Sequence, residues 1–372
     1  EFFRYVMRGT PSAGTPGARI SEQIKDVFDR PYLPGSSLKG ALRTVLFWSA
    51  YRAREKAPDL NRLKRNTSRA SQPLQQQVFG RDPNHDWLRA LRVRDSASLD
   101  PTEHLALHTV RIHPTARTGS PGLDVNVEAF KRETVIHTSI ALETYGFQDP
   151  EAARLRWQGQ REHIKRLAEW GRRRAEERLQ TEVRHHREIG GPGRTLRFYK
   201  LIRNLADQLP DYTFLLQVGW GAGWESKTLG SSMLRQSDGQ FEQLLSTYRM
   251  TKQRSRSPGD PFPVSRHLVL INGEPVLPMG WVAVRVTGLD QIEVSEQPER
   301  EPAAGQRTGT VKWFSPSKGY GFVAPDGGGE DIFLHSSGLL DPSHPPREGD
   351  RLAFDVEQAA KGPRAVNAQT IR

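Results

Sequence analysis

The chain contains no cysteine. This absence excludes disulfide bonds, zinc sites built on thiolates and thiol nucleophiles, and it is typical of proteins that work in a reducing cytoplasm. The sequence also lacks an apolar run long enough to cross a bilayer, and it shows no signal peptide. From these absences we expect a cytoplasmic protein with no membrane partner.

Charge is distributed unevenly along the 372 residues. The formal net charge is +11, a balance typical of proteins that bind nucleic acid or another polyanion. Residues 307–372 hold eight basic and eight acidic residues, so the preceding part carries the whole excess. The length allows two or three domains with a substantial core.

The stretch PYLPGSSLKGALR, residues 31–43, predicts the start of a helix with unusual backbone freedom. Pro34 fixes its own φ and keeps the preceding residue extended, so the helix begins after it. Gly35 permits conformations that are closed to other residues, and Ser36 or Ser37 is a good N-cap.

Lys39 and Arg43 lie four residues apart in that stretch and therefore share one face at the positive end of the helix dipole. With the backbone of Gly35–Ser37 they predict a site for a phosphate backbone. The alternative is an ordinary helix start with solvated cations, and the stretch alone favours that alternative. The stretch is not a Walker A loop, since Ala41 and Leu42 stand where Lys and Ser or Thr are required.

Hydrophobic periodicity predicts a mixture of helices and strands before residue 295. We expect helices at 20–28, 35–54, 150–188, 196–209 and 236–250, and strands at 2–7, 91–96, 132–145, 214–218, 264–277 and 281–286. The polar segment 59–77 predicts a mobile loop. The basic segment 251–263, which contains proline and serine, predicts a loop. We expect 132–145 to form a hairpin with residues 108–113.

The helical region 150–188 is strongly charged. Between Arg161 and Glu188 it has nine basic residues against six glutamates. A basic side that faces RNA or a partner and a solvated charged face fit this pattern equally well. His185 and His186 are adjacent, so they point to different helix faces and make a poor metal pair. We expect no metal and no cofactor.

A glycine loop, GWGAGWESKTLG, spans residues 219–230 and follows a predicted strand. Gly219, Gly221 and Gly223 let the backbone approach a ligand closely. The spacing is not a dinucleotide fingerprint, because Trp224 occupies the position of the third glycine.

The second half of this loop supplies a cation and a hydroxyl. Lys227 and Thr228 are placed to reach a phosphate, and Trp220 or Trp224 to stack on a base. The alternative is a glycine-rich turn that carries core tryptophans. We favour RNA binding, because flexible backbone, a cation and aromatic rings coincide here.

Residues 307–372 carry aromatic residues at strand spacing, after a segment of linker composition at 295–306. Bases of a single strand stack on such rings almost regardless of sequence. We expect Lys312, Phe314 and Lys318 to take part in this binding. The rings expected to form one platform are Trp313, Tyr320, Phe322, Phe333 and His335.

Two motifs in this region, KGYGFV at 318–323 and DIFLH at 331–335, resemble the ribonucleoprotein motifs of the cold-shock domain family. VKWF at 311–314 and AKGPRAVN at 360–367 are also similar to that family. The resemblance implies a five-stranded OB-type barrel that binds single-stranded RNA or DNA. Since the region has no net charge, we expect stacking to contribute more than electrostatic attraction.

The stretches 31–43 and 219–230, with VFG at 78–80 and LRVRDS at 91–96, resemble the RAMP superfamily of CRISPR-associated RNA-binding proteins. Their order is most similar to the family of type III-A (Csm) subunits that cap the 3′ end of the guide RNA, the fifth of the Csm series. The resemblance implies ferredoxin-like (RRM-like) modules with helical insertions. It also implies guide RNA and other RAMP subunits of the Csm complex as partners.

We therefore expect an α+β chain in three parts: a guide-RNA-binding RAMP region at 1–294, a linker at 295–306 and a small all-β cold-shock barrel at 307–372. The strand and glycine-bearing loop with which the family begins are not recognisable, so we expect them to be missing or diverged. A fused cold-shock domain is not typical of the family, and it implies added binding of single-stranded target nucleic acid.

Two other functions are compatible with the sequence. A metal-independent CRISPR RNA endoribonuclease of the RAMP superfamily needs a general acid or base near the scissile phosphate. The histidine candidates for that role are His104, His108, His113 and His137. A stand-alone RNA chaperone driven by the cold-shock domain is the third possibility. We expect a non-catalytic RNA-binding subunit, because nothing in the sequence brings two such groups together.

Overall fold

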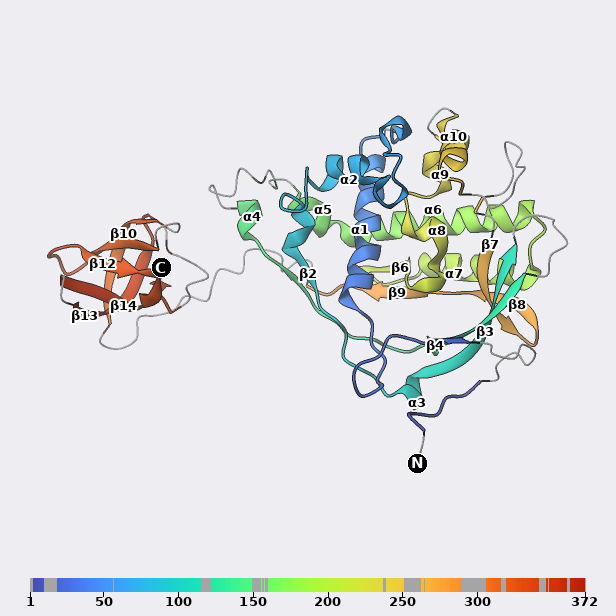
Figure 1. Ribbon diagram of the computed structural model, residues 1–372, viewed down its shortest axis with the longest axis horizontal. Coiled ribbons are helices and arrows are strands. Elements are labelled where there is room, and N and C mark those ends of the chain that lie inside the picture. The colour runs from blue at the N-terminus through green and yellow to red at the C-terminus, as the bar shows by residue number, and fades with distance from the viewer. Residues whose placement is uncertain are drawn as a thin grey trace. The chain divides into compact units, whose positions relative to one another are not determined.

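The chain divides into two compact units, residues 1–292 and 293–372 (Figure 1). The structure is a computed structural model, and it describes residues 3–9, 19–55, 57–114, 122–148, 155, 157, 160–236, 239–250, 262–263, 265–288, 306–315, 319–340, 346, 348–359 and 362–371. Helices and mostly antiparallel strands are mixed in the first unit, which confirms the α+β prediction. Among the described helices, none has both the length and the apolar character needed to span a membrane.

The largest sheet of the first unit has the order β1-β4-β3-β7-β8. Its strands are β1 (Ile20–Ser21), β3 (Leu105–Pro114), β4 (Leu123–Phe130), β7 (Ser265–Ile271) and β8 (Glu274–Pro278). Only β1 and β4 pair in parallel; β3 lies between β4 and β7 and is antiparallel to both. Two further pairs join β2 (Leu91–Val93) to β5 (Ile140–Leu142) and β6 (Thr213–Gln217) to β9 (Trp281–Arg285).

The hairpin expected between 132–145 and 108–113 is wrong. From Val110 to Ile112 both edges of β3 are occupied, one by β4 and the other by β7, so this part of β3 has no free edge for another strand. The strand inside 132–145 is β5, and it pairs instead with β2.

The helices of the first unit include the long elements that periodicity predicted. They are α1 (Gly35–Arg52), α2 (Gln72–Phe79), α3 (Pro101–His104), α4 (Tyr145–Gln148), α5 (Arg161–Lys165), α6 (Leu167–Glu188), α7 (Gly193–Ala206), α8 (Gly223–Lys227), α9 (Ser231–Leu234) and α10 (Gln240–Thr247). The predictions of α1, α6, α7 and α10 are confirmed, as are β2, β6, β7, β8 and β9. Most of 150–160 and 251–263, and all of 295–305, lie outside the described residues.

Three local predictions near the start of the chain are wrong. Residues 20–28 form β1 and a turn instead of a helix, because the Asp26 carboxylate accepts the backbone N–H groups of Phe28 and Arg30 at 2.9 and 3.0 Å. Residues 3–7 form no strand, and only Arg8 bridges to β3. Segment 59–77 contains 3-10 helices η1 (Leu60–Arg62) and η2 (Thr67–Arg69) and most of α2.

The expectation of a mobile loop at 59–77 fails because buried side chains anchor that segment. Leu60 and Leu74 belong to the main hydrophobic core. Asp59 and Asn66 start the two 3-10 turns by accepting backbone N–H groups two residues ahead, at 3.1 and 3.0 Å.

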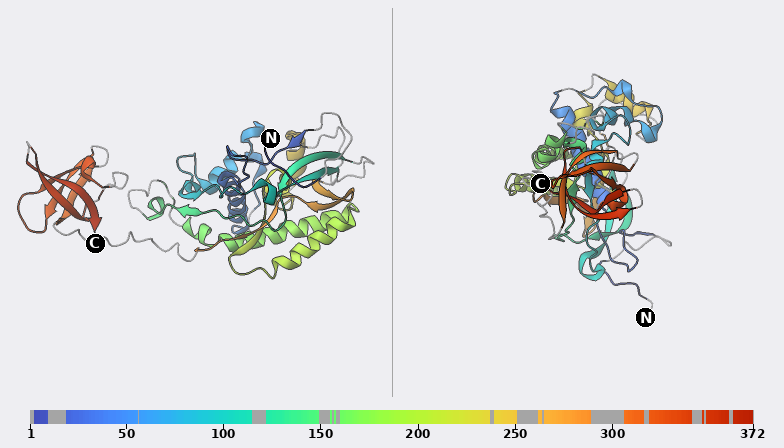
Figure 2. Two further views of the ribbon diagram at one scale, coloured as in Figure 1. Left: turned by 90° about the horizontal axis from the view of Figure 1, so that it is seen from below. Right: turned by 90° about the vertical axis from the view of Figure 1, so that its left-hand side faces the viewer.

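The core of the first unit forms where α1 meets α6 (Figure 1). The Trp48 ring of α1 lies edge-on to Trp170 of α6 at 6.5 Å, and its Nε1 donates to the Glu177 carboxylate at 3.1 Å. On the other side α6 packs along α7 (Figure 2) through a second cluster that includes Leu179, Tyr199 and Leu215.

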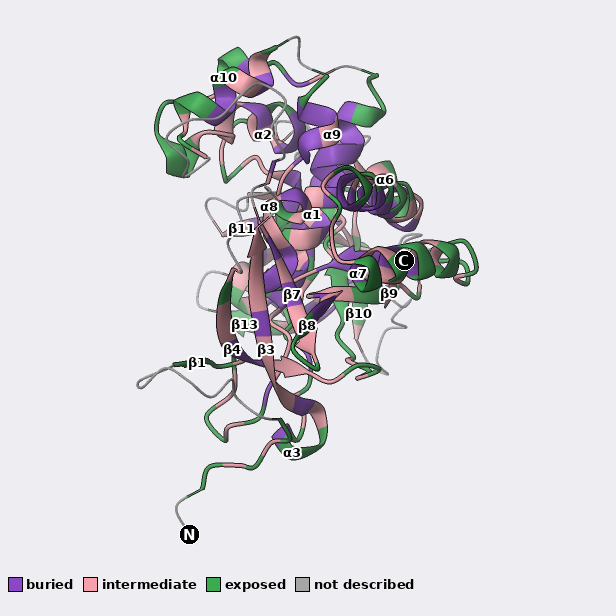
Figure 3. Cartoon of the chain, turned by 90° about the vertical axis from the view of Figure 1, so that its right-hand side faces the viewer, coloured by how far each residue is buried: buried purple, intermediate pink, exposed green. Residues whose placement is uncertain are grey.

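Part of the charge of α6 is buried inside the molecule. Arg174, Arg178 and Glu182 recur at intervals of four and therefore share one face, and all three are buried. Figure 3 shows α6 nearly end-on, with buried residues on one side and exposed ones on the other. Neither sequence interpretation of 150–188, a ligand-facing basic side or a solvated face, describes this inner side.

Glu182 is the centre of these buried charges. Its carboxylate accepts from Arg178 at 2.9 Å and from Arg266 of β7 at 2.9 Å. Burial by itself raises the pKa of Glu182, but the two guanidinium groups outweigh that effect and hold the pKa well below its usual range. The carboxylate is therefore ionised and links α6 to the sheet.

His185 and His186 lie beside this network and are buried as neutral groups. Burial lowers the pKa of His185 to about 3 and of His186 to about 4, and the positive charge of Arg266 adds to both shifts. No group of three or more ligand-type side chains that could hold a metal ion occurs among the described residues.

The second unit is a closed barrel with the strand order β10-β11-β12-β14-β13. Its strands are β10 (Arg307–Ser315), β11 (Tyr320–Pro325), β12 (Ile332–His335), β13 (Arg351–Ala359) and β14 (Gly362–Ile371), with a 3-10 turn η6 (Ser336–Gly338). Val311, Val323, Leu334 and Phe354 are among the buried side chains that fill it. The five-stranded OB-type barrel predicted for this region is confirmed.

The buried histidines predict a specific acid sensitivity. An unfolded imidazole takes up a proton near pH 6.5, whereas His186 does so only near pH 4, so stability is complete above pH 6.5 and falls as the pH drops toward 4. Between pH 7 and 5 the free energy of unfolding should fall by about 2 kcal/mol per buried histidine. Denaturant titrations at several pH values, followed by hydrogen exchange in α6, measure this loss.

The matched variants for that measurement are His186→Leu and His137→Leu, of which only the first removes a buried imidazole. His186→Leu should flatten the pH dependence, and His137→Leu should leave it as in the unchanged chain. An equally steep dependence in His186→Leu would show that His186 is not the neutral buried group described here.

Candidate nucleic-acid interfaces

The start of α1 is held by the segment that follows β2. The Gly35 N–H donates to the Asp95 carboxylate at 2.7 Å, and no side chain of the helix's own first residues caps it. The predicted N-cap role of Ser36 or Ser37 is therefore wrong, and both residues are exposed. A Cβ on Gly35 would lie 2.2 Å from the Val93 carbonyl oxygen, so glycine is required by this close approach.

Lys39 and Arg43 share one face of α1, as expected, but they differ in their surroundings. Arg43 donates to the Asp86 carboxylate at 2.7 Å and to Gln75 at 3.3 Å, and its guanidinium lies 3.8 Å from the centre of the Phe79 ring. Lys39 makes no ion pair among the described residues. Partial burial lowers its pKa, with Arg43 adding to the effect and Asp86 opposing it. Of these two cations, Lys39 is therefore the one that has no ion-pair partner among the described residues.

The glycine loop forms two short turns, η5 (Trp220–Ala222) and α8. Gly219 and Gly223 have φ of 83° and 73°, a region that favours glycine. Gly221 is required for a different reason, since a Cβ there would lie 2.5 Å from the Cβ of Met279. Gly221 therefore lets the loop pack closely against Met279, between β8 and β9, and Gly219 and Gly223 let its backbone turn.

A buried guanidinium, which the sequence did not indicate, holds the loop from below. Arg174 donates to the carbonyl oxygens of Glu225, Thr228 and Leu229 at 3.0, 2.9 and 3.1 Å. Burial and the neighbouring Arg178 lower the pKa of Arg174 to about 10, so it remains charged at neutral pH. One side chain of α6 thereby holds three carbonyl groups of the loop in place.

The loop's own carboxylate completes this support. Glu225 is buried and accepts the Ser231 backbone N–H at 3.0 Å and its hydroxyl. Arg178 lies 3.8 Å from the same carboxylate. The only sequence signal for this arrangement was the interval of four between charged residues of α6, and such an interval is equally common on solvated helices.

Residues of the loop predicted to meet RNA fall into two groups. Lys227 is exposed and makes no ion pair among the described residues, and the half-exposed Trp220 ring lies 4.5 Å from His267. Thr228 is occupied within the loop, since its hydroxyl donates to the Trp224 carbonyl and accepts the Gly230 N–H. Lys227 and Trp220 are therefore exposed side chains of the loop that are free to meet a ligand, and the partly buried Trp224 lines a pocket.

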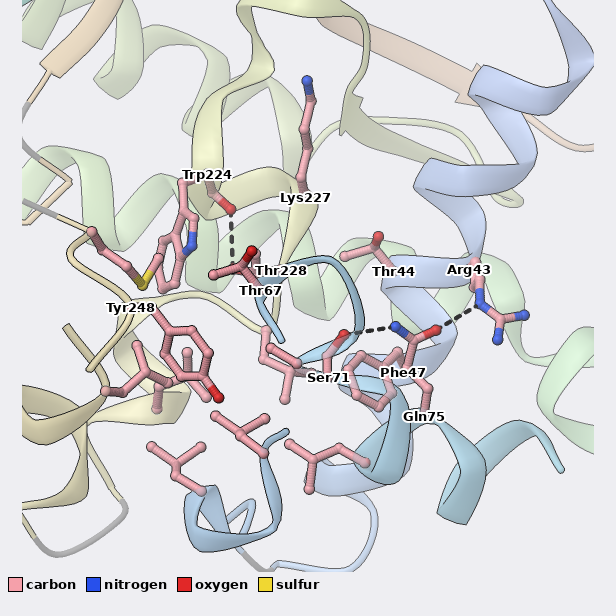
Figure 4. Close-up of a pocket in the computed structure, with 18 of the residues that line it drawn as sticks. Arg43, Thr44, Phe47, Thr67, Ser71, Gln75, Trp224, Lys227, Thr228 and Tyr248 are labelled. Carbon is pink, nitrogen blue, oxygen red and sulfur yellow. Dashed lines mark hydrogen bonds between the residues drawn. The ribbon is translucent and has the colours of Figure 1, made fainter. Parts of the chain in front are cut away.

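The two predicted stretches meet in one pocket of about 430 Å³ (Figure 4). Arg43 from the first stretch lines it, as do Lys227 and Thr228 from the second. Segments of α2 and α10 close its other sides. Lys39 and the Gly35–Ser37 backbone do not line the pocket. The fold thus places Arg43 in the same pocket lining as Lys227 and Thr228, although Arg43 lies far from both of them in the sequence.

The histidine candidates for a nuclease do not form a site among the described residues. His108 and His113 are five residues apart in β3 and so lie on opposite faces of the sheet. His104 belongs to α3, before the start of that strand, and His137 is exposed on the segment before β5. Burial lowers the pKa of both His108 and His113.

The barrel unit carries a continuous aromatic platform. Trp313, Phe322 and Phe333 lie opposite one another on β10, β11 and β12, with ring centres 5.7 and 5.6 Å apart. Tyr320 touches Trp313 and Phe333 at 5.5 and 5.9 Å, and His335 stacks on Phe333 at 6.4 Å. All five predicted rings are therefore brought together.

The other three residues of the barrel predicted to bind nucleic acid do not belong to the aromatic platform. Phe314 packs against the barrel core and is not part of the platform, because successive residues of a strand face opposite sides. Lys312 is exposed and pairs with the Asp331 carboxylate at 2.9 Å. Lys318 lies outside the described residues.

Two family models match the chain. The one described as "RAMP superfamily" matches residues 10–226, and the one described as "'Cold-shock' DNA-binding domain" matches residues 307–371. "Cold shock-like protein CspA" of Stigmatella aurantiaca (strain DW4/3-1) is 46% identical over 65 residues, which cover 17% of this chain and 96% of that protein.

Solved structures are similar to the larger part of the chain. A chain of "Cryo-EM structure of Csm-crRNA-target RNA ternary complex in type III-A CRISPR-Cas system" is 26% identical, with a TM-score of 0.50, over 72% of this chain and 76% of that one. "Crystal structure of T.onnurineus Csm5" is 22% identical, with a TM-score of 0.45, over 73% of this chain and 76% of that one.

Removing the buried guanidinium should loosen the glycine loop. Arg174→Met deletes the three hydrogen bonds to loop carbonyls and the ion pair with Glu177, which should cost about 3 kcal/mol in the free energy of unfolding. Backbone amides of 225–231 should exchange with solvent faster. The neighbouring Arg173→Met removes an exposed guanidinium and should change stability by less than about 0.5 kcal/mol. Equal exchange in both variants would contradict the role assigned to Arg174.

The platform predicts binding by stacking. Phe333→Ala should weaken binding of the full chain to a short single-stranded RNA by about tenfold, because one base–aromatic contact contributes about 1–3 kcal/mol. The salt dependence should stay unchanged, since no phosphate contact is lost. Leu340→Ala removes an exposed apolar side chain outside the platform and is the control. A steeper or shallower salt dependence in Phe333→Ala would speak against stacking.

Proposed function

The chain belongs to the RAMP superfamily and carries a cold-shock domain, and on this premise we propose that it is a guide-RNA-binding subunit of a type III-A (Csm) CRISPR ribonucleoprotein. The observation that carries the proposal is the single pocket that Arg43, Lys227 and Thr228 line together. The similarity to a chain of a Csm–crRNA–target RNA complex supports it.

The first unit is the one that we assign to the guide RNA. The net positive charge of the chain lies before residue 307, and phosphate neutralisation is the main source of affinity for RNA. Lys39 and Lys227 are cations without ion-pair partners among the described residues, so we assign the phosphate contacts to them. Arg43 is paired with Asp86, so we assign it a structural role: it links α1 to α2 at the wall of the pocket.

We further propose that the guide is held near its 3′ end, as the order of the sequence motifs suggests, and that neighbouring RAMP subunits are the protein partners. The cold-shock barrel would bind a separate single-stranded segment, such as target RNA, through its platform. A cytoplasmic location and a role in antiviral defence follow from this assignment. We favour binding over cleavage because the histidine candidates do not converge.

Cross-linking tests the 3′ assignment. Guide RNAs with a single 4-thiouridine at either end would be assembled with the full chain and the other effector subunits. The proposal predicts cross-links to this chain from the 3′ position. Cross-links from the 5′ position alone would contradict it, and cleavage of the guide that is lost on a His→Ala substitution would favour the endoribonuclease.

Phosphate binding by the two free lysines has a quantitative consequence. The double variant Lys39→Ala, Lys227→Ala should weaken guide binding about tenfold and lower the salt dependence, log Kd against log salt, by about 1.4, since each contact on a single strand contributes about 0.7. Filter binding at several salt concentrations measures both quantities.

The matched control is Arg194→Ala, Lys200→Ala, which removes the same charge from two exposed positions of α7. It should change neither quantity appreciably beyond the general loss of charge. Equal effects of the two double variants would mean that only net charge matters and that α1 and the glycine loop are not the RNA site.

A further inference from the structure

The pocket between α1 and the glycine loop is larger and more apolar than phosphate binding requires. Its volume of about 430 Å³ lies within the range of about 300–1,000 Å³ that is typical of small-molecule sites. Contacts with a sugar–phosphate backbone need cations and N–H donors on an open surface. A concave, mostly apolar volume next to such cations fits an occupant that has an apolar face.

The walls come from segments that are far apart in the sequence. Most of the lining side chains are apolar, and they belong to α1, α2, α8 and α10 and the turns beside them. Several of them are buried members of the main core, so the floor of the pocket is fixed by packing. The principal apolar side chains are Phe47, Leu74, Phe79, Trp224, Leu244 and Tyr248.

Two aromatic rings of this pocket are only partly buried. Trp224 of α8 lies edge-on to Phe262 at 4.8 Å, and Tyr248 is fixed by a hydrogen bond from its hydroxyl to the Lys64 carbonyl. Figure 4 shows Trp224 and Tyr248 on one side of the pocket, with Phe47 across from them. Rigid rings of this kind are surfaces on which a planar group can rest.

A few polar groups lie at the edge of the apolar volume. The Ser71 hydroxyl accepts from the Gln75 amide at 2.9 Å, and that amide's oxygen accepts from Arg43. The exposed Thr67 makes no side-chain hydrogen bond among the described residues. An apolar pocket with a small number of placed polar groups is the usual form of a site that selects one orientation of its ligand.

The charge beside the pocket indicates what the ligand is attached to. Lys227 is exposed at the pocket lining and has no ion-pair partner among the described residues. Arg43 is offset by Asp86 but adds a second cationic side chain to the same lining. A ligand with an apolar planar part and a neighbouring negative charge satisfies both features.

We infer that this pocket takes one extruded base of the bound RNA, with the adjoining phosphate at Lys227. A base offers two apolar faces to the rings and hydrogen-bonding edges to Thr67 and Ser71. The inference rests on the proposed function, because it assigns a specific subsite to the RNA that the first unit binds. An apolar side chain of a protein partner would match the walls but would leave Lys227 without a counter-charge.

Abasic scanning of the RNA tests the inference. The full chain would carry Trp313→Ala and Phe333→Ala, so that the barrel platform contributes little. It would be titrated with single-stranded guide RNAs that lack one base at a time. One position should weaken binding about tenfold, the scale of one lost base–aromatic contact, and its neighbours should weaken binding less than twofold.

A second test fills the pocket with a large side chain and compares this variant with a control that carries the same substitution outside the pocket. Thr67→Trp adds an indole from an exposed lining position, and Gln77→Trp adds the same group to an exposed position of α2 outside the lining. Thr67→Trp should weaken binding of intact RNA about tenfold and abolish the penalty of the sensitive abasic position. Gln77→Trp should leave both unchanged.

The possible failures are distinguishable. Loss of all RNA binding by the platform-silenced chain would overturn the proposed function together with the base pocket. RNA binding without any sensitive position would overturn the base pocket alone. If Thr67→Trp leaves RNA binding intact but prevents association with other effector subunits, the occupant is a protein side chain and the inference is wrong.

Discussion

The hydrogen bonds from the buried Arg174 guanidinium to three carbonyls of the glycine loop are the contacts on which the proposed RNA surface of the first unit depends. Carbonyls inside a protein need partners, and the backbone of a loop this rich in glycine has many accessible conformations. Burying a cation is costly unless it is fully paired, which explains the neighbouring carboxylates of Glu177 and Glu225. The glycine-rich sequence suggests a flexible loop, but the hydrogen bonds from Arg174 of α6 hold this loop in one conformation.

The two units are suited to nucleic acid in physically different ways. The first has the charge excess and a pocket beside Lys227, so its affinity should depend on salt. The barrel has no net charge, pairs Lys312 with Asp331 and presents five touching rings, so its affinity should depend on stacking. A chain with both modes can hold a guide strand and a second single strand without one displacing the other.

Sequence reasoning predicted the elements with strong periodicity, such as α1 and the barrel strands, and it predicted the rings of the platform because strand alternation fixes their side. It failed where side chains override the local pattern. Residues 20–28 were expected to form a helix, but the Asp26 carboxylate stabilises a turn there, and Leu60 and Leu74 anchor the segment 59–77 that was expected to be a mobile loop. It also could not tell that Arg174 and Glu182 point inward, since an interval of four looks the same on a solvated helix. Pairing across β3 and the burial of Phe314 required the folded chain.

The central claim, that α1 and the Arg174-supported glycine loop form one RNA surface, is tested most directly by mapping protein–RNA cross-links by mass spectrometry. The full chain bound to its guide RNA would be irradiated and digested. The account predicts cross-linked peptides from 35–43 and from 220–228 in the same complexes, in addition to those of the barrel. Cross-links confined to the barrel, or to exposed α7 with neither stretch represented, would contradict it.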